Sequence, residues 1–173
     1  MIELKNHILF PPISVAVGHF NLSDEWIEKV KAFCLEIGER DESSFYTSTY
    51  FTTKKVHEEP FIKQVLDHVI KDGEEFVESW IQTYDKKSGF HAPHNHRGVL
   101  VASCLYLDDG EGTYFFEPLQ NRQQNVPVKR GDILYWNPEL IHFSPPTEEE
   151  KTIIGMNIDY LPQVWDYITH SEP

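Results

Sequence analysis

The chain has 173 residues, of which 40% are hydrophobic and 13% aromatic, and its formal net charge at pH 7 is −13. This length favours one domain with a sizeable core, and the composition excludes a disordered chain. The sequence contains no apolar run of about twenty residues, which excludes a membrane-spanning helix. The acidic balance weighs against a nucleic-acid partner, because phosphate binding relies on clustered Lys and Arg.

The first residues and the cysteines indicate the cellular compartment of the protein. Residues 1–10 show neither a basic segment with an apolar core nor a small-residue cleavage site, so we expect no secretory signal. The two cysteines, Cys34 and Cys104, lie in apolar contexts and make no disulfide framework. We therefore expect a cytoplasmic protein in which both thiols are small core residues.

The N-terminal part of the chain alternates between strand-like and helix-like patterns. Residues 7–17 are apolar and partly alternating around a proline turn, which predicts an opening strand. Residues 21–38 begin with capping and acidic residues and continue with an apolar stripe, which predicts a helix. Next we expect a polar linker, a strand rich in Tyr, Phe and Thr, and a second helix that begins at a proline, over 40–44, 45–53 and 60–73.

From residue 76 onward the apolar spacing changes from helical to alternating. We expect strands, divided by Gly, Pro, Asn or Asp, over 76–84, 99–107, 113–116, 126–128, 132–136 and 152–158. Two helices followed by a series of short strands predict a helix layer packed on a β-sandwich or small barrel, a mainly β fold of the jelly-roll or cupin type. We expect one domain over 1–173, in which 1–75 supports a β core in 76–160.

Three histidines carry the clearest chemical signal. His94 and His96 lie two residues apart, so they share one face of an extended strand and could both reach one ion. Pro93 removes a backbone donor, which is tolerated at a strand edge or end. His142 follows an apolar strand between two turns (130–138), which would return the chain to the same end of a barrel. Neutral imidazole suits Fe, Zn and Cu, and three ligands leave positions open for oxygen and a co-substrate.

These residues also allow a plainer interpretation. His94 and His96 could be solvated in an exposed turn beside basic residues, and His142 taken alone fits a hydrogen-bonded core histidine. Acids are other candidate ligands, although the aspartates among them stand beside glycine as turn residues do, and we expect none at the metal. These candidates are Asp108, Asp109, Glu117 and Asp132.

A longer set of motifs resembles a known family. The motifs are GFHAPHNH (89–96), SCLYL (103–107), GEGTYFF (110–116), GDILYW (131–136), His142 and KTII (151–154). Together they resemble the core of the 2-oxoglutarate- and iron(II)-dependent oxygenases, near the prolyl hydroxylase-like group. Residues 9–13 and 80–96 are similar to those of small phage and bacterial oxygenases. The resemblance covers residues 80–160 well and the N-terminal third loosely. It implies a single oxygenase domain built on a double-stranded β-helix, with Fe(II) as the metal and 2-oxoglutarate as co-substrate.

The resemblance assigns the metal ligands with one departure. The family holds its metal with His-x-Asp/Glu and a distal His, which His94 and His142 match. His96 stands where the family has the carboxylate. We expect His96 to bind as a third neutral imidazole, which removes one negative charge from the site and lowers its affinity for iron. The other reading is that two histidines bind and water completes the site.

The resemblance also implies a buried cation for the far carboxylate of 2-oxoglutarate. Lys151, nine residues after the distal histidine, matches that place, although it also ends a charged run and could lie in a solvated loop. Tyr84 and Tyr106 match positions where related enzymes place hydroxyl groups against the co-substrate, and core packing is the alternative for each. His91 matches a position that supports the metal site or faces the substrate.

The function implied by the resemblance is hydroxylation of a small-molecule or peptide substrate, with release of succinate and carbon dioxide. One alternative is a cupin-type three-histidine metalloenzyme that does not use 2-oxoglutarate. Such enzymes normally add a Glu soon after His-x-His, whereas residues 97–101 contain none. Another alternative is a catalytically silent jelly-roll binding module, which would explain the missing carboxylate. Neither the substrate nor the oligomeric state follows from the sequence.

Overall fold

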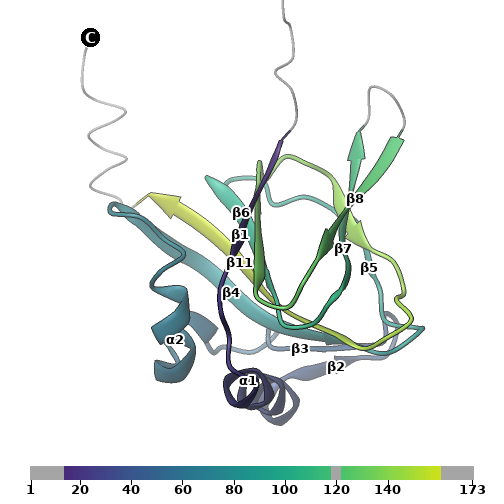
Figure 1. Ribbon diagram of the computed structural model, residues 1–173, viewed down its shortest axis with the longest axis horizontal. Helices are drawn as coiled ribbons and strands as arrows, with labels where there is room; N and C mark the ends of the chain where they lie inside the picture. The colour runs from purple at the N-terminus through teal and green to yellow at the C-terminus, as the bar shows by residue number, and fades with distance from the viewer. Residues whose placement is uncertain (1–13, 118–121, 161–173) are drawn as a thin grey trace, which may run out of the picture.

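The computed structural model describes residues 14–117 and 122–160, so the opening strand expected over 7–17 lies partly outside the described residues. Within these ranges the chain folds into two antiparallel sheets and two α-helices. Figure 1 shows both helices on one side of the molecule and strands β5, β7 and β8 on the other. The mainly β jelly-roll fold expected from the sequence is confirmed.

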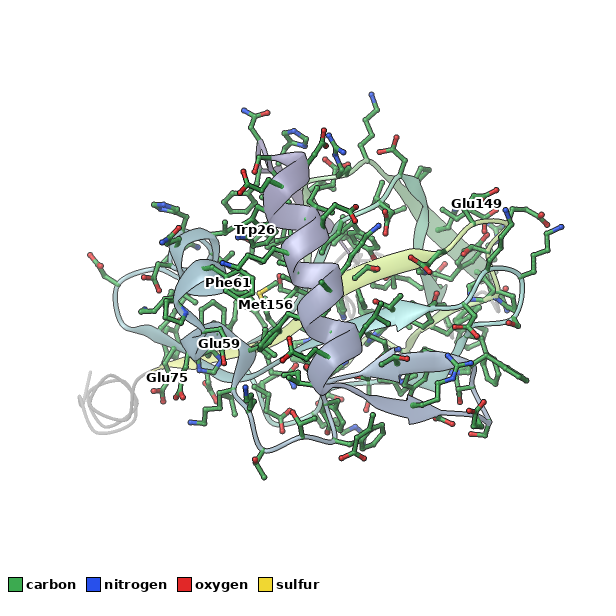
Figure 2. All side chains as sticks on the ribbon, turned by 90° about the horizontal axis from the view of Figure 1, so that it is seen from below. Trp26, Glu59, Phe61, Glu75, Glu149 and Met156 are labelled. Atoms are coloured by element: carbon green, nitrogen blue, oxygen red, sulfur yellow. The ribbon has the colours of Figure 1, made fainter. Side chains whose placement is uncertain are left out.

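Helix α1 (Asp24–Ile37) covers one face of the larger sheet. The Ser23 hydroxyl accepts a hydrogen bond from the Trp26 backbone N–H, which caps the first turn, and Asp24 and Glu25 complement the positive end of the helix dipole. The buried side of α1 packs on the sheet through Ile27, Val30 and Cys34. Figure 2 shows the helix lying across the strands of this sheet.

The second helix, α2 (Pro60–Leu66), follows the short 3-10 helix η1 (Val56–Glu58) and packs beside α1. The Phe61 ring meets Phe33 edge to face at 5.6 Å, and the Trp26 indole N–H donates to the Phe61 carbonyl at 2.7 Å. This helix is shorter than the predicted 60–73, because the chain after Leu66 tightens into turns with i to i+3 hydrogen bonds. Neither of the described helices has the length and apolar character that crossing a membrane requires.

The larger sheet has seven strands in the order β1-β9-β6-β11-β4-β3-β2. Its long central pair, β11 and β4, runs antiparallel and places Lys151 opposite Tyr84. The strands are, in spatial order, β1 (Val15–His19), β9 (Asp132–Trp136), β6 (Val101–Tyr106), β11 (Lys151–Tyr160), β4 (Glu74–Tyr84), β3 (Tyr46–Ser48) and β2 (Glu39–Asp41).

The smaller sheet has four strands in the order β5-β10-β7-β8. These strands are β5 (His91–His94), β10 (His142–Ser144), β7 (Gly110–Glu117) and β8 (Arg122–Val128). Strand β5 lies at the edge of this sheet, which is where Pro93 was expected to be tolerated. The sheet therefore brings the two histidine-bearing strands side by side.

Alternation along the strands separates two hydrophobic cores. On β6, Cys104 and Tyr106 belong to a cluster with Phe115 and Trp136 that lies between the sheets, whereas Leu105 points to the core beneath the helices. Both cysteines are buried and free, as expected. The candidate site lies between the sheets, beside the first of these clusters.

Two local predictions were wrong. Residues 39–41, within and beside the expected linker, form the edge strand β2, because they pair with β3 in the register Glu39↔Ser48 to Asp41↔Tyr46. The strand expected over 45–53 ends at Ser48, because Thr52 closes a turn by donating its N–H to the Thr49 carbonyl at 3.0 Å. In contrast, the strand predicted over 132–136 is found at those residues.

Candidate metal centre

Three histidines bring their Nε2 atoms together at one end of the smaller sheet. His94 ends β5 and His142 begins β10, and the two are directly paired across these strands. His96 lies just beyond β5, where its backbone N–H donates to the Pro138 carbonyl at 2.8 Å. The His96 Nε2 lies 3.2 Å from the Nε2 atoms of both His94 and His142. The structure thus brings together the three residues that the sequence predicted as ligands.

Backbone carbonyls fix two of these rings. The His94 Nδ1 lies 2.8 Å from the Ala92 carbonyl, and the His142 Nδ1 lies 3.0 Å from the Leu140 carbonyl. Because a carbonyl oxygen only accepts, each ring carries its proton on Nδ1 and presents an Nε2 lone pair to the cluster. Partners of this kind orient metal-binding imidazoles in proteins.

The spacing of the nitrogens fits a bound divalent ion. Two nitrogens at about 2.1 Å from an ion and about 90° apart are about 3.0 Å from each other, close to the observed 3.2 Å. A proton on His96 Nε2 could satisfy one neighbouring lone pair but not both, whereas one cation satisfies all three nitrogens. Within the part of the chain that the structure describes, this ligand group contains no carboxylate. The donor set is therefore three neutral imidazoles.

Burial keeps these imidazoles neutral. It is the largest cause that lowers the pKa of His96 to about 4 and of His142 to about 3, and the nearby His94 ring lowers both further. Burial also lowers the pKa of His94 itself. Neutral imidazole is the form that binds a metal, so the three rings are ready to bind at neutral pH.

Aromatic side chains enclose two of the candidate ligands. The Trp80 ring stacks on His96 with centroids 5.7 Å apart and planes at 16°, and Trp136 packs edge to face against His142 at 4.9 Å. Trp80 can take this place because Gly155 on the neighbouring strand has no side chain. A Cβ at residue 155 would lie 2.4 Å from the indole ring. These rings shield part of the surface of the two ligands from solvent.

His91 lies against the cluster, as the resemblance suggested. Its ring stacks on His94 with centroids 4.2 Å apart, and its Nδ1 lies 3.4 Å from the Gln82 amide nitrogen. Burial, followed by the neighbouring rings of His94 and His96, lowers the pKa of His91 to about 4. The side chain therefore stands as a neutral ring behind one candidate ligand.

Lys151 is buried, with 5% of its surface exposed, so the alternative interpretation as part of a solvated loop is wrong. Its Nζ donates to the Ser144 hydroxyl, lies 3.5 Å from the Gly112 carbonyl, and sits 4.9 Å from the centre of the Tyr84 ring. No carboxylate of the described residues forms an ion pair with it. Burial lowers the pKa of Lys151 to about 8, against smaller opposing effects of Cys104 and Glu111. The lysine therefore stands in the core as a cation without a counterion.

A cavity leads from the histidines toward Lys151. It holds about 410 Å³ of empty space, part of which is open to solvent, and all three candidate ligands line it together with Tyr84, Thr113 and Ser144. Lys151 does not line the cavity itself, but its ammonium group donates a hydrogen bond to Ser144, which does. Tyr106 is also behind the wall, because its hydroxyl is hydrogen bonded to Thr113.

The sequence analysis missed Ser144 and Thr113 as lining residues. Ser144 lies two residues after His142 on β10, so the alternation of a strand could have placed both side chains on one face. Thr113 had no comparable signal. The structure therefore adds two hydroxyl groups to the predicted site residues.

The four acidic residues considered as other candidate ligands lie outside the histidine cluster, as expected. Asp108 pairs with Lys31 at 2.6 Å, and its other oxygen accepts the Thr152 N–H at 2.8 Å. Asp109 accepts the Arg130 N–H at 2.7 Å. The other two acids, Asp132 and Glu117, lie at the ends of strands, and Asp132 pairs with His19. None of the four belongs to the group of potential metal ligands.

Comparisons with known proteins identify solved structures with a similar fold. No protein-family model matches the chain, and no curated protein matches it in sequence. The structure is similar to that of a Pseudomonas putida prolyl-4-hydroxylase, with 14% identity and a TM-score of 0.58 over 86% of this chain and 94% of that chain. It is similar to HygX from Streptomyces hygroscopicus with nickel and 2-oxoglutarate bound, with 14% identity and a TM-score of 0.62 over 87% of this chain and 84% of that chain.

A third similar structure is a prolyl hydroxylase from Trichoplax adhaerens in complex with a hypoxia inducible factor peptide fragment. It shares 10% identity and a TM-score of 0.60, over 91% of this chain and 87% of that chain. Sequence identities this low establish a likeness of fold. The chain has the double-stranded β-helix fold of the 2-oxoglutarate- and iron(II)-dependent oxygenases, with three histidines that could hold a metal.

Proposed function

We propose that this protein is an Fe(II)- and 2-oxoglutarate-dependent oxygenase that hydroxylates a small-molecule or peptide substrate. One observation carries the proposal: three Nε2 atoms converge at a cavity that leads to a buried lysine, and no carboxylate of the described residues forms an ion pair with this lysine. The fold neighbours, which include structures with 2-oxoglutarate and with a peptide bound, support it.

In this proposal His94, His96 and His142 hold the iron through their Nε2 atoms. Bound iron and 2-oxoglutarate supply the chemistry in which O2 and 2-oxoglutarate convert a C–H bond to C–OH, with release of succinate and carbon dioxide. The carbonyls of Ala92 and Leu140 keep two of the rings in the binding tautomer. The protein contributes binding, orientation and exclusion of water, while the metal and co-substrate carry the redox step.

Lys151 would bind the far carboxylate of 2-oxoglutarate. Because Lys151 is buried, an ion pair between its ammonium group and a carboxylate is stronger than it would be at the surface. The Ser144 hydroxyl lies between the lysine and the cavity, so it is placed to hydrogen bond the same carboxylate. Tyr84 lines the cavity directly, whereas Tyr106 would act on the co-substrate through Thr113.

Metal and co-substrate binding can be tested before the substrate is known. We expect equilibrium dialysis followed by metal analysis to find one bound Fe(II) per chain under anaerobic conditions. We expect 2-oxoglutarate, or its inert oxalyl analogue, to raise the melting temperature when the metal is present. A ligand at 100 times its Kd stabilises the fold by about 2.7 kcal/mol. Release of succinate with candidate substrates would then establish turnover.

The outcomes separate the proposal from its alternatives. Absence of metal binding would contradict it and would favour a silent binding module. Metal binding without stabilisation by 2-oxoglutarate would favour a cupin-type three-histidine enzyme. Replacement of Lys151 by Met serves as the matched control, because it should remove the response to 2-oxoglutarate and keep the metal.

A further inference from the structure

A second cleft opens beside the histidine cluster. It holds about 630 Å³ of space, including the part open to solvent, and the candidate ligands His94 and His96 form its inner end. The rest of the lining is dominated by rings that belong to two rows. Each row begins with a tyrosine or phenylalanine and ends on one of the two candidate ligands.

The first row runs from the surface to His96. The Phe51 and Tyr50 rings meet edge to face at 5.5 Å, and Tyr50 meets Trp80 in the same way at 5.4 Å. Trp80 then stacks on His96. Phe51 and Tyr50 are each about half exposed, at 54% and 51%. Large apolar side chains left exposed next to a candidate metal site indicate a contact surface for a ligand.

The second row is formed by Tyr46, His91 and His94. The Tyr46 and His91 rings have centroids 5.8 Å apart, and His91 stacks on His94 at 4.2 Å. Because both rows line the same cleft, a group that enters it meets several ring faces or edges. Such contacts favour a flat aromatic group, which can stack on a ring or meet it edge to face.

The lining contains no charged side chain. A cationic group in this cleft would lose water without gaining an anionic partner, and a divalent ion held by His94 and His96 would repel it. Besides the histidines, the tyrosine hydroxyls and the Trp80 indole N–H, the lining offers two carboxamide side chains for hydrogen bonding, Gln82 and Asn95. Gln82 is almost completely buried, with 2% of its surface exposed. Carboxamides donate and accept, so they can bind the polar edge of a neutral ring.

We propose that this cleft is the substrate subsite and that it takes a flat aromatic or heteroaromatic ring with a hydrogen-bonding edge that carries no positive charge. The inference rests on the proposed function, since it places the group to be hydroxylated beside His94 and His96. The aromatic rows supply stacking and edge-to-face contacts, and the carboxamides bind a polar edge as donors and acceptors. A saturated, puckered ring of the same size fits the cleft less well.

The test compares three fragments of nearly equal size on the full chain loaded with Zn(II), which binds imidazole and does not turn over. The fragments are benzamide, cyclohexanecarboxamide and benzamidine, and ligand-observed NMR measures their affinities. We expect benzamide to bind about three- to tenfold more tightly than each of the other two, as the loss of ring contacts or the burial of a positive charge predicts.

Variants locate the binding site. Tyr50→Ala and Phe51→Ala should each weaken benzamide binding by about threefold or more, and both side chains are exposed enough for the fold to tolerate the change. Tyr114→Ala is the matched control, because that ring packs on Phe143 and lies outside the cleft lining. Equal binding of benzamide and cyclohexanecarboxamide, or equal losses in Tyr50→Ala and Tyr114→Ala, would overturn the inference.

These measurements do not depend on 2-oxoglutarate. Selective binding of benzamide by a chain that ignores 2-oxoglutarate would keep the ring site and contradict the proposed function. Binding of metal and 2-oxoglutarate by a chain without selectivity for benzamide would keep the proposed function and overturn the ring site.

Discussion

Replacing Lys151 with methionine should make the protein more stable at neutral pH and remove its response to 2-oxoglutarate. The lysine is buried and has no described carboxylate partner, so the folded chain holds a positive charge at a cost. Methionine has a similar length and no charge. A stability gain that accompanies a loss of ligand binding is typical of residues kept for function.

The size of the effect follows from the pKa of Lys151, which burial lowers from 10.5 to about 8. At about 1.4 kcal/mol per pKa unit, this interval corresponds to about 3 kcal/mol. Below pH 8 the lysine is charged in both the folded and the unfolded chain, and the whole cost is present. Between pH 8 and 10.5 the unfolded chain holds a proton that the folded chain has released, so the stability of the wild type rises with pH.

The variant also loses the hydrogen bonds from Lys151 to Ser144 and Gly112, which together contribute about 2 kcal/mol. The Lys151→Met protein should therefore be more stable than the wild type by about 1 kcal/mol at pH 7, and less stable by about 2 kcal/mol near pH 10.5. Urea unfolding of both proteins between pH 7 and 10.5 measures the two free energies. The order of stability should reverse within that range.

Lys86→Met is the control, because Lys86 is half exposed and pairs with Glu149 on the surface. It should show no reversal relative to the wild type. A difference in unfolding free energy between wild type and Lys151→Met that stays constant from pH 7 to 10.5 would refute the reasoning. It would mean that the folded chain holds the charge of Lys151 at no cost in free energy.

Three further outcomes are expected. His142→Ala should weaken metal binding by more than about 100-fold in equilibrium dialysis, and retention of wild-type affinity would contradict a ligand role. Gly155→Ala should destabilise the fold by about 1–3 kcal/mol in urea unfolding and alter tryptophan fluorescence, because the new Cβ would lie 2.4 Å from the Trp80 ring. Unchanged stability and fluorescence would show that Gly155 and Trp80 are not tightly packed. Calorimetry should show the affinity for 2-oxoglutarate falling by up to about tenfold per pH unit above pH 8, as Lys151 loses its proton, and a flat profile would argue for another partner.

Local patterns were enough to predict much of the fold. The capping residues and apolar stripe of residues 21–38 predicted α1, and alternation predicted β9 at its observed bounds. These elements follow from side-chain periodicity and from capping, and both depend on residues that are close in the sequence. The convergence of His94, His96 and His142 could also be predicted, because strand alternation and the turns around 130–138 restrict where the chain can return.

Features set by distant partners could not be predicted from local patterns. The β2 strand contains Glu39 and Asp41, which are poor strand formers, and it exists because β3 pairs with it. Tyr106 was expected to present its hydroxyl to the co-substrate, but Thr113 on a neighbouring sheet binds that hydroxyl. The aromatic rows likewise depend on contacts such as Tyr50 with Trp80, which are 30 residues apart in the chain.

Because the three imidazoles are neutral, binding of the metal ion and binding of 2-oxoglutarate are coupled in the proposed site. A divalent ion held by a carboxylate would leave a net charge of +1, whereas three uncharged rings leave the full +2. That charge attracts the dianion 2-oxoglutarate, and by thermodynamic reciprocity the metal and 2-oxoglutarate each raise the affinity for the other by the same factor. Iron would then be held loosely by the protein alone and firmly in the ternary complex, so the metal content of the protein would follow the cell's supply of 2-oxoglutarate.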